Sequence, residues 1–340
     1  MSIKVGVIGL GFMGTTHVRA YQSVGATLVA VLDQSEDRRS GAINNTGNIG
    51  SARQEQLFDP DSLNATDDLD AFLATPELEL VSICTPTDTH IELAQRVINA
   101  GKHLIIEKPV ALRSIDVQTI GEQASDAGVL CMPAMCMRFW PAWAYVKQLI
   151  DQRTLGQLRS LHLERLGAAP TWNDDFYLNP DRSGGALFDL HIHDTDFINH
   201  AIGIPEGVTT TGTANHHTTT YHYPDQELQV IAQGGWLPAP TFPFTMRLLA
   251  RFEEGVADFD LARDDQLLVH RKDGSTETPT LDPADGWQAE VSAMVNAVAS
   301  YASEAPATMQ SASDSTRILE AERESLARGS AVHLDHSSVF

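Results

Sequence analysis

Asp189 and His193 stand four residues apart in the stretch GGALFDLHIHDTD (184–196), a spacing that suits proton transfer. If 186–202 is one helix that ends at Gly203, side chains four apart share a face, and the Asp189 carboxylate can orient the His193 imidazole. A nearby carboxylate also favours the protonated imidazole, as proton exchange near neutral pH requires. The stretch predicts a catalytic pair on a helix that begins just after two glycines.

The same helix argues against a metal ion in this stretch. His191 and His193 are two residues apart and point to nearly opposite sides of a helix, so both cannot ligate one ion. Three more histidines, in the Thr-rich stretch NHHTTTYHY, have no carboxylate or cysteine at ligand spacing. We expect a solvated loop or sheet surface there and predict no metal site. These histidines are His216, His217 and His222.

Lys108 is a second group that could move a proton. It follows the apolar run HLIIE and precedes Pro109 in the triplet EKP. A lysine held at the carboxyl edge of a sheet can donate a hydrogen bond to a substrate oxygen or help to relay its proton, whereas an ordinary strand-end lysine reaches solvent. The residues leave both interpretations open, and the cis or trans state of the Lys108–Pro109 bond is also undecided.

Gly9, Gly11 and Gly14 form a GxGxxG in GLGFMG, between a strand pattern and a helix pattern. The first glycine permits a tight turn, the second lets the backbone approach a pyrophosphate, and the third lets helix and strand pack closely. The phosphates would lie at the helix N-terminus. The motif in this context predicts a dinucleotide site.

Asp33 ends the second strand pattern, where its carboxylate can accept hydrogen bonds from both hydroxyls of the adenosine ribose. A 2′-phosphate would be repelled there, which favours NAD over NADP. Arg38 and Arg39 are close enough in sequence to weaken that preference.

CTPTDTH (84–90) follows a third strand pattern and opens a helix, so it lies at the ligand-binding edge of such a sheet. Thr85 and Pro86 would line the wall beside the nicotinamide. His90 would contact the cofactor or be no more than a capping or surface residue. The predicted cofactor-binding residues are Gly9, Gly11, Phe12, Met13, Gly14, Asp33, Thr85, Pro86, His90, Glu107 and Lys108.

The elements that must position these residues divide the chain into two parts. In residues 1–131, short β-branched runs alternate with helical patterns closed mostly by glycine, which predicts an α/β dinucleotide-binding domain with a doubly wound parallel sheet. In residues 132–340, strands separated by turns predict an α+β domain with a large, mostly antiparallel sheet. Two amphipathic helices near 286–303 and 313–328 close the chain.

Composition narrows the class of protein. A length of 340 residues fits two domains, and 42% hydrophobic with 20% charged residues is ordinary for a globular protein. The formal net charge of −22 argues against nucleic acid or anionic lipid as the main partner. No stretch approaches the roughly 20 apolar residues of a membrane span. With three cysteines in apolar surroundings and no secretory signal, we expect a cytoplasmic protein.

Together, GLGFMG, CTPTDTH, EKP and GGALFDLHIHD resemble the Gfo/Idh/MocA oxidoreductase family, and the resemblance covers nearly the whole chain. It implies that Lys108, Asp189 and His193 act beside a nicotinamide on an alcohol or its ketone, commonly of a sugar or cyclitol. It also implies a homodimer or homotetramer that pairs through the sheet of the second domain.

Arg138, Trp172 and Asn173 are predicted, with His193, to line the substrate cleft. An aromatic face suits a pyranose or cyclitol ring, and an arginine suits a carboxylate or hydroxyl. Packing at a domain interface is the alternative for each of the first three.

The sequence therefore predicts an NAD-dependent oxidoreductase acting on a secondary alcohol of a sugar, polyol or cyclitol. Two alternatives stay open: a glycosidase that uses NAD for transient oxidation, and a non-enzymatic sensor of NAD or sugar. The presence of Lys108, Asp189 and His193 argues against the sensor. Whether Lys108 or His193 is the immediate base is not decided.

Overall fold

The computed structural model describes residues 2–43, 55–170, 174–177 and 179–334, which fold into two compact units. Unit 1 comprises Met1–Cys136 and Ala284–Ser313, and unit 2 comprises Met137–Pro283 and Asp314–Phe340. The first crossing lies close to the domain boundary expected after residue 131. Unit 2 differs from the expected second domain because the chain returns to unit 1 for one helix.

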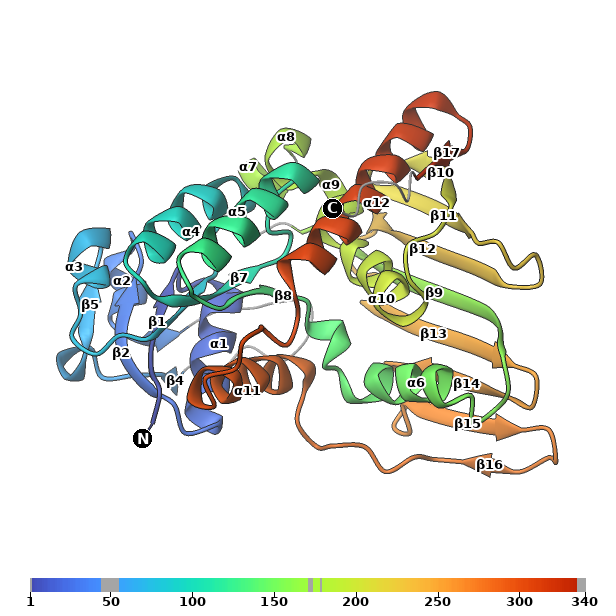
Figure 1. Cartoon of the computed structure of the whole chain (residues 1–340), viewed down its shortest axis with the longest axis horizontal. Helices are drawn as coiled ribbons and strands as arrows, with labels where there is room; N and C mark the ends of the chain where they lie inside the picture. The colour runs from blue at the N-terminus through green and yellow to red at the C-terminus, as the bar shows by residue number, and fades with distance from the viewer. Residues whose placement is uncertain (1, 44–54, 171–173, 178, 335–340) are drawn as a thin grey trace. The chain divides into compact units, whose positions relative to one another are not determined.

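Unit 1 is built on a six-stranded sheet in the order β5-β2-β1-β6-β7-β8 (Figure 1). Every neighbouring pair is parallel, so the predicted doubly wound parallel sheet is confirmed. The order reverses between β1 and β6, and ligands bind at the carboxyl ends of strands beside such a reversal. The strands are β1 (Lys4–Ile8), β2 (Thr27–Leu32), β5 (Asn64–Thr66), β6 (Leu80–Ile83), β7 (His103–Glu107) and β8 (Cys131–Ala134).

Helices connect these strands and bury their apolar sides against the sheet. A late helix, α11, packs on the first helix, α1 (Figure 1). The rings of Phe12 and Trp287 meet edge to face between these helices, with their centroids 6.1 Å apart. The helices of unit 1 are α1 (Phe12–Ser23), α2 (Glu36–Arg39), α3 (Leu69–Leu73), α4 (His90–Asn99), α5 (Ser114–Asp126) and α11 (Gly286–Ala299). Short elements are β3 (Ala42–Ile43), β4 (Glu55–Gln56), and the 3-10 turns Pro60–Ser62 and Thr87–Thr89.

Unit 2 contains a nine-stranded sheet in the order β16-β15-β14-β13-β9-β12-β11-β10-β17. Only the β9 and β12 pair is parallel among its pairings, so the predicted mostly antiparallel sheet is confirmed. The strands are β9 (Leu158–Ala168), β10 (Gly207–Thr213), β11 (His216–His222), β12 (Gln229–Leu237), β13 (Thr245–Phe252), β14 (Gly255–Asp260), β15 (Leu267–Arg271), β16 (Thr276–Glu277) and β17 (Val332–His333).

One face of this sheet packs against helices, as Trp143 shows. This α6 side chain is fully buried between Phe197 of α10 and Phe259 of β14. Its ring centroid lies 4.7 Å from that of Phe197 and 6.2 Å from that of Phe259. Side chains that alternate with the buried ones point to the other face, where Leu249 of β13 is 42% exposed. The remaining helices are α6 (Pro141–Gln152), α7 (Asp174–Tyr177), α8 (Pro180–Ser183), α9 (Gly185–Asp189), α10 (Ile192–Ile202) and α12 (Met309–Arg328), with a 3-10 turn at Cys136–Arg138.

The helix expected over 186–202 is interrupted, which corrects the sequence prediction. α9 ends at Asp189, and α10 begins at Ile192 and ends before Gly203. At the interruption the backbone N–H of His191 bonds to the carbonyl of Ala186, five residues back, instead of the usual four. Asp189 and His193 therefore belong to two short helices and not to one face of a single helix.

Across the part of the chain that the structure describes, no helix is long and apolar enough to cross a membrane.

Candidate cofactor and catalytic sites

The glycine fingerprint closes a tight turn between β1 and α1. Gly9 has φ +86°, and a Cβ there would lie 2.7 Å from the Cys84 carbonyl oxygen. A Cβ on Gly14 would lie 1.8 Å from the Gly9 carbonyl oxygen, so helix and strand can approach only if residue 14 is glycine. A Cβ on Gly11 would meet nothing within 4 Å. Gly9 and Gly14 are thus required by packing, and Gly11 faces open space.

That space lies at the N-terminus of α1, where it suits an anion. Gly11 is the N-cap, its backbone has no side-chain cap, and the first turn carries no acidic residue. The first N–H groups of a helix have no partner within the helix and attract negative charge. The residues present therefore fit a dinucleotide pyrophosphate.

Asp33, at the end of β2, is 6% exposed and already holds two backbone groups. Its Oδ2 accepts a hydrogen bond from Leu10 N at 2.7 Å, and its Oδ1 accepts one from Ser35 N at 2.8 Å. Carboxylate oxygens can each accept a further bond, so a ribose hydroxyl can still be held. Arg38 lies 3.6 Å away with its side chain 53% exposed. The site offers a carboxylate to a ribose and an arginine to a 2′-phosphate.

His90 is neither a helix cap nor a surface residue. The alternative interpretation from the sequence is therefore wrong for His90. The ring is buried, with Nδ1 3.0 Å from the Pro109 carbonyl and Nε2 2.8 Å from the Thr85 carbonyl. Burial lowers the pKa of His90 below its usual 6.5, although the carbonyls and Glu107 act in the opposite direction. The imidazole links the two loops in which Thr85, Pro86 and Lys108 stand. Its predicted contact with the cofactor stays a prediction.

Glu107 ends β7 and Lys108 follows it, in different surroundings. The Glu107 carboxylate is buried, 3.0 Å from Nε2 of His17 on α1, and it accepts a hydrogen bond from Lys108 N. Nδ1 of His17 lies 2.9 Å from Ser82 Oγ, so this histidine, which sequence reasoning missed, links the helix to two strands. Lys108 is half-buried, and its bond to Pro109 is cis. Glu107 is thus anchored inside unit 1.

Asp189 and His193 are half-buried in unit 2, on either side of the interruption between α9 and α10. Gly184 and Gly185 before them both have positive φ, 74° and 70°. A Cβ on Gly184 would lie 2.4 Å from Phe188 Cβ, and one on Gly185 would lie 2.8 Å from an oxygen of the Asn215 side chain. The two glycines are therefore required by contacts within the protein.

Arg138, predicted to bind substrate, is engaged by a partner inside unit 2. Its Nε and Nη2 donate to Asp196 of α10 at 2.8 and 2.6 Å, and Ser315 also donates to that carboxylate at 2.8 Å. Both members of the ion pair are buried. A substrate contact stays a prediction for Arg138. Trp172 and Asn173 lie outside the described residues.

His217 contradicts the expectation of a solvated surface. It is 1% exposed, whereas its strand neighbours His216 and His222 are exposed. It lies beside the equally buried His191 and Glu322, and one potential ligand atom from each of the three falls within 4.8 Å of the others. Side chains alternate strictly between the two faces of β11, so the adjacent His216 and His217 point to opposite faces. This alternation is the signal in the sequence that one of the two is buried.

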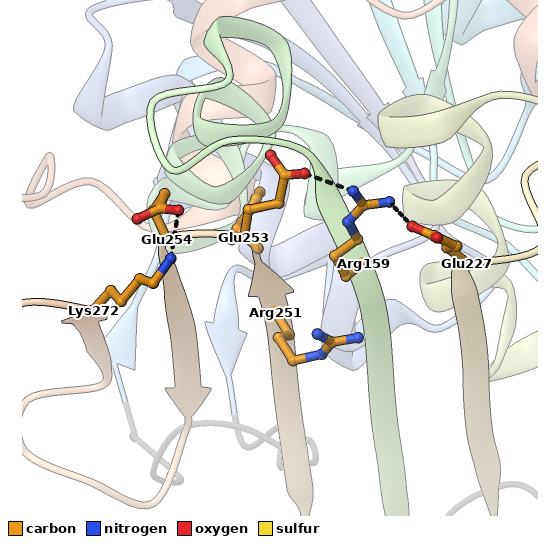
Figure 2. Close-up of a pocket in the computed structure, with 7 residues that line it drawn as sticks. Arg159, Glu227, Arg251, Glu253, Glu254 and Lys272 are labelled. Carbon is orange, nitrogen blue, oxygen red and sulfur yellow. Dashed lines mark hydrogen bonds and ion pairs between the residues drawn. The ribbon is translucent and has the colours of Figure 1, made fainter.

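A shallow pocket of about 590 Å³ on unit 2 contains none of the predicted site residues (Figure 2). Its charges neutralise one another: Arg159 bridges Glu227 and Glu253 at 2.6 Å each, and Lys272 meets Glu254 at 2.8 Å. Exposed ion pairs of this kind contribute little and leave no concentrated charge for a ligand. The lining residues are Arg159, Glu227, Arg251, Phe252, Glu253, Glu254 and Lys272.

Comparison with known proteins gives the same architecture. The levoglucosan dehydrogenase structure, a complex with NADH and levoglucosan, has a TM-score of 0.81 over 99% of this chain and 100% of that one, at 21% identity. Inositol 2-dehydrogenase of Rhizobium meliloti is 32% identical over 63% of this chain and 59% of its own length. D-xylose 1-dehydrogenase (NADP(+)) 2 of Haloferax volcanii is 26% identical over 96% of this chain and 99% of its own length.

The alignments with the first three curated relatives cover only 52, 59 and 55% of those proteins. Family models cover both parts of the chain. Residues 3–135 match the oxidoreductase family with an NAD-binding Rossmann fold, and residues 143–318 match the GFO/IDH/MocA C-terminal domain. With both models matched in order, the chain belongs to the Gfo/Idh/MocA oxidoreductase family.

Proposed function

We propose that this protein is an NAD-dependent dehydrogenase that interconverts a secondary alcohol of a sugar, polyol or cyclitol and the corresponding ketone. The observation that carries the proposal is the fingerprint turn, in which Gly9 and Gly14 are fixed by packing and Gly11 opens onto the start of α1. Asp33 at the end of β2 supports NAD. The names of the inositol and xylose dehydrogenases support the substrate class.

A bound nicotinamide supplies the hydride acceptor for this chemistry. In the oxidative direction, His193 takes the proton of the substrate hydroxyl while the hydride leaves the carbon that bears this hydroxyl, so that a carbonyl remains. Asp189 stabilises the imidazolium that forms. Lys108 donates a hydrogen bond to the reacting oxygen, where a positive charge favours the alkoxide-like transition state. His193 is the group proposed to hold the proton afterwards.

Two further features belong to the proposal. Protomers associate through the open face of the large sheet, where Leu249 is exposed and no helix covers the alternating residues of the described β13. The protein works in the cytoplasm, which suits Cys131 and Cys136 as buried thiols.

Absorbance in the reduced-nicotinamide band tests the activity directly. The purified chain is mixed with NAD, or with NADP in parallel, and a panel of inositols, pentoses, hexoses and anhydrosugars. Growth of the band with NAD and one member of the panel supports the proposal. Release of an aglycone from a glycoside without net reduction would assign a glycosidase instead. Sugar binding by calorimetry with neither product would assign a sensor.

A further inference from the structure

We propose that unit 2 holds a divalent ion of the zinc type between His191, His217 and Glu322. The three side chains come from the α9–α10 interruption, from β11 and from α12, and they are 0, 1 and 0% exposed. One potential ligand atom from each lies within 4.8 Å of the others. Two imidazoles and one carboxylate form a common zinc donor set. None of the three belongs to the proposed dehydrogenase machinery.

Unpartnered nitrogen atoms point to something that this cluster binds. Among the described residues, both ring nitrogens of His217 and Nδ1 of His191 have no hydrogen-bond partner. Buried polar atoms nearly always have one, and those that lack a protein partner commonly meet a water or an ion. The rings touch edge to face, 4.4 Å between centroids. The two nitrogens of His217 that lack a partner can therefore serve an ion bound beside Nε2 of His191 and Oε2 of Glu322.

The charges in the cluster favour a cation. Within the described chain, Glu322 forms no ion pair with a lysine or an arginine, and its one charged contact is His191, with Nε2 3.2 Å from Oε2. A buried carboxylate needs compensation by positive charge.

Hydrogen bonds from three hydroxyl groups hold the carboxylate in place. Oε1 accepts from Thr195 at 3.0 Å and from Tyr221 at 2.9 Å, and Oε2 accepts from Thr219 at 3.3 Å. Such contacts orient the ligands of metal sites and tune their basicity. Gly234 of β12 makes room, because a Cβ there would lie 2.7 Å from Nδ1 of His191.

The spacing suits one ion after a small contraction. Two ligands on a tetrahedral zinc ion with bonds of roughly 2.0 to 2.1 Å are about 3.3 Å apart. The 3.2 Å between His191 Nε2 and Glu322 Oε2 already matches that separation. The ligand atoms of all three residues lie within 4.8 Å of one another, and this limit is larger than the separation on a zinc ion. The ion therefore draws the ligands together as it binds. Binding should therefore tie α12 to the sheet and to the α9–α10 interruption.

Metal content and cobalt absorption test the site in the full-length protein without an affinity tag. We expect about one equivalent of zinc after loading and removal of excess, and cobalt should give the visible absorption of a nitrogen and oxygen site. His217→Ala should lose both signals, and His216→Ala, its exposed neighbour on β11, should keep both. Glu322→Gln keeps the shape of the side chain and should weaken zinc binding by at least about tenfold.

Circular dichroism and Tm keep the test informative if one variant folds poorly. Zinc should raise the Tm of the wild-type protein and of His216→Ala by several degrees, and chelation should reverse the rise. A wild-type protein that takes up no zinc or cobalt and shows no Tm shift would overturn the proposal. Equal metal loss in His216→Ala would also overturn it, because surface histidines would then be the binders. Neither readout depends on dehydrogenase activity, so the two proposals fail separately.

Discussion

Arg138 is fixed to Asp196 by two hydrogen bonds, at 2.8 and 2.6 Å, inside unit 2. Asp196→Ala leaves a buried guanidinium without its counter-charge, so we expect the free energy of unfolding to fall by about 3 to 5 kcal/mol. Denaturant unfolding measures this change. The double variant Arg138→Met, Asp196→Leu should lose less than the sum of the single variants. If Arg138→Lys raised only the KM for substrate and left unfolding unchanged, Arg138 would be mainly a substrate ligand.

Gly11→Ala and Gly14→Ala form a matched pair. The Gly14 variant places a methyl group 1.8 Å from the Gly9 carbonyl oxygen and should fold poorly or lose several degrees of Tm. In the Gly11 variant, the methyl group meets nothing within 4 Å, and the Tm should hardly move. Its Kd for NAD should rise at least about tenfold, because the methyl group occupies the space above the helix N-terminus. Calorimetric titration with NAD measures the Kd. An unchanged Kd would contradict this location of the pyrophosphate.

Asp33 should decide between the two dinucleotides. The wild-type protein should bind NAD more tightly than NADP, and Asp33→Ala should narrow the difference by about tenfold, because the carboxylate no longer repels a 2′-phosphate and Arg38 is released. Titration with both dinucleotides checks the ratio. Asp33→Asn, which keeps an acceptor for Leu10 N or Ser35 N, separates loss of charge from collapse of the loop. Equal wild-type affinities would refute the predicted preference.

His90 predicts a stability that depends on pH. Burial lowers its folded-state pKa below the 6.5 of an unfolded chain, so the unfolded state binds the proton first. Its contribution to stability is therefore complete above about pH 6.5 and is lost as the pH falls, by up to about 1.4 kcal/mol per pH unit. His90→Gln should flatten the slope of unfolding free energy between about pH 7 and pH 5.5. An identical slope in variant and wild type would show that His90 titrates normally.

His193→Ala separates chemistry from cofactor binding. Once a substrate is known, kcat should fall by about 10² to 10⁴, the usual range for a positioned acid or base, while the Kd for NAD stays within about twofold. Asp189→Asn should keep the fold and shift the pH profile of kcat/KM, because the carboxylate no longer supports the imidazolium that forms. Near-normal turnover by His193→Ala on the true substrate would remove it from the mechanism.

The parallel sheet and the dinucleotide fingerprint could be predicted because their determinants are local. Gly9 and Gly14 act within one turn, and the strand before them and the helix after them are readable from a few residues. Asp33 could be predicted because it ends the second strand pattern. The sheet of unit 2 was equally readable as a class, since its strands alternate, but its parallel β9–β12 pair was not.

The surroundings of His191 could not be predicted in the same way. The widened turn at this residue accompanies contacts with Tyr221 and Glu322, which are 30 and 131 residues away. A periodicity argument assumes a regular helix. Because the helix is interrupted at His191, that argument cannot show which residues its side chain contacts. One signal was available: His217, Thr219 and Tyr221 alternate with exposed or half-buried residues, the pattern of a strand with one buried face.

The packing of α11 on α1 affects how the protein is made. α1 leaves the ribosome early, but the helix that covers Phe12 follows only after residues 137–283 of unit 2 have been synthesised. At about 5 to 20 residues per second, this delay lasts on the order of ten seconds or more. During that time the side of α1 that packs on α11 in the folded protein stays uncovered. The folding of unit 1 is thus completed late, when about the last sixth of the chain emerges.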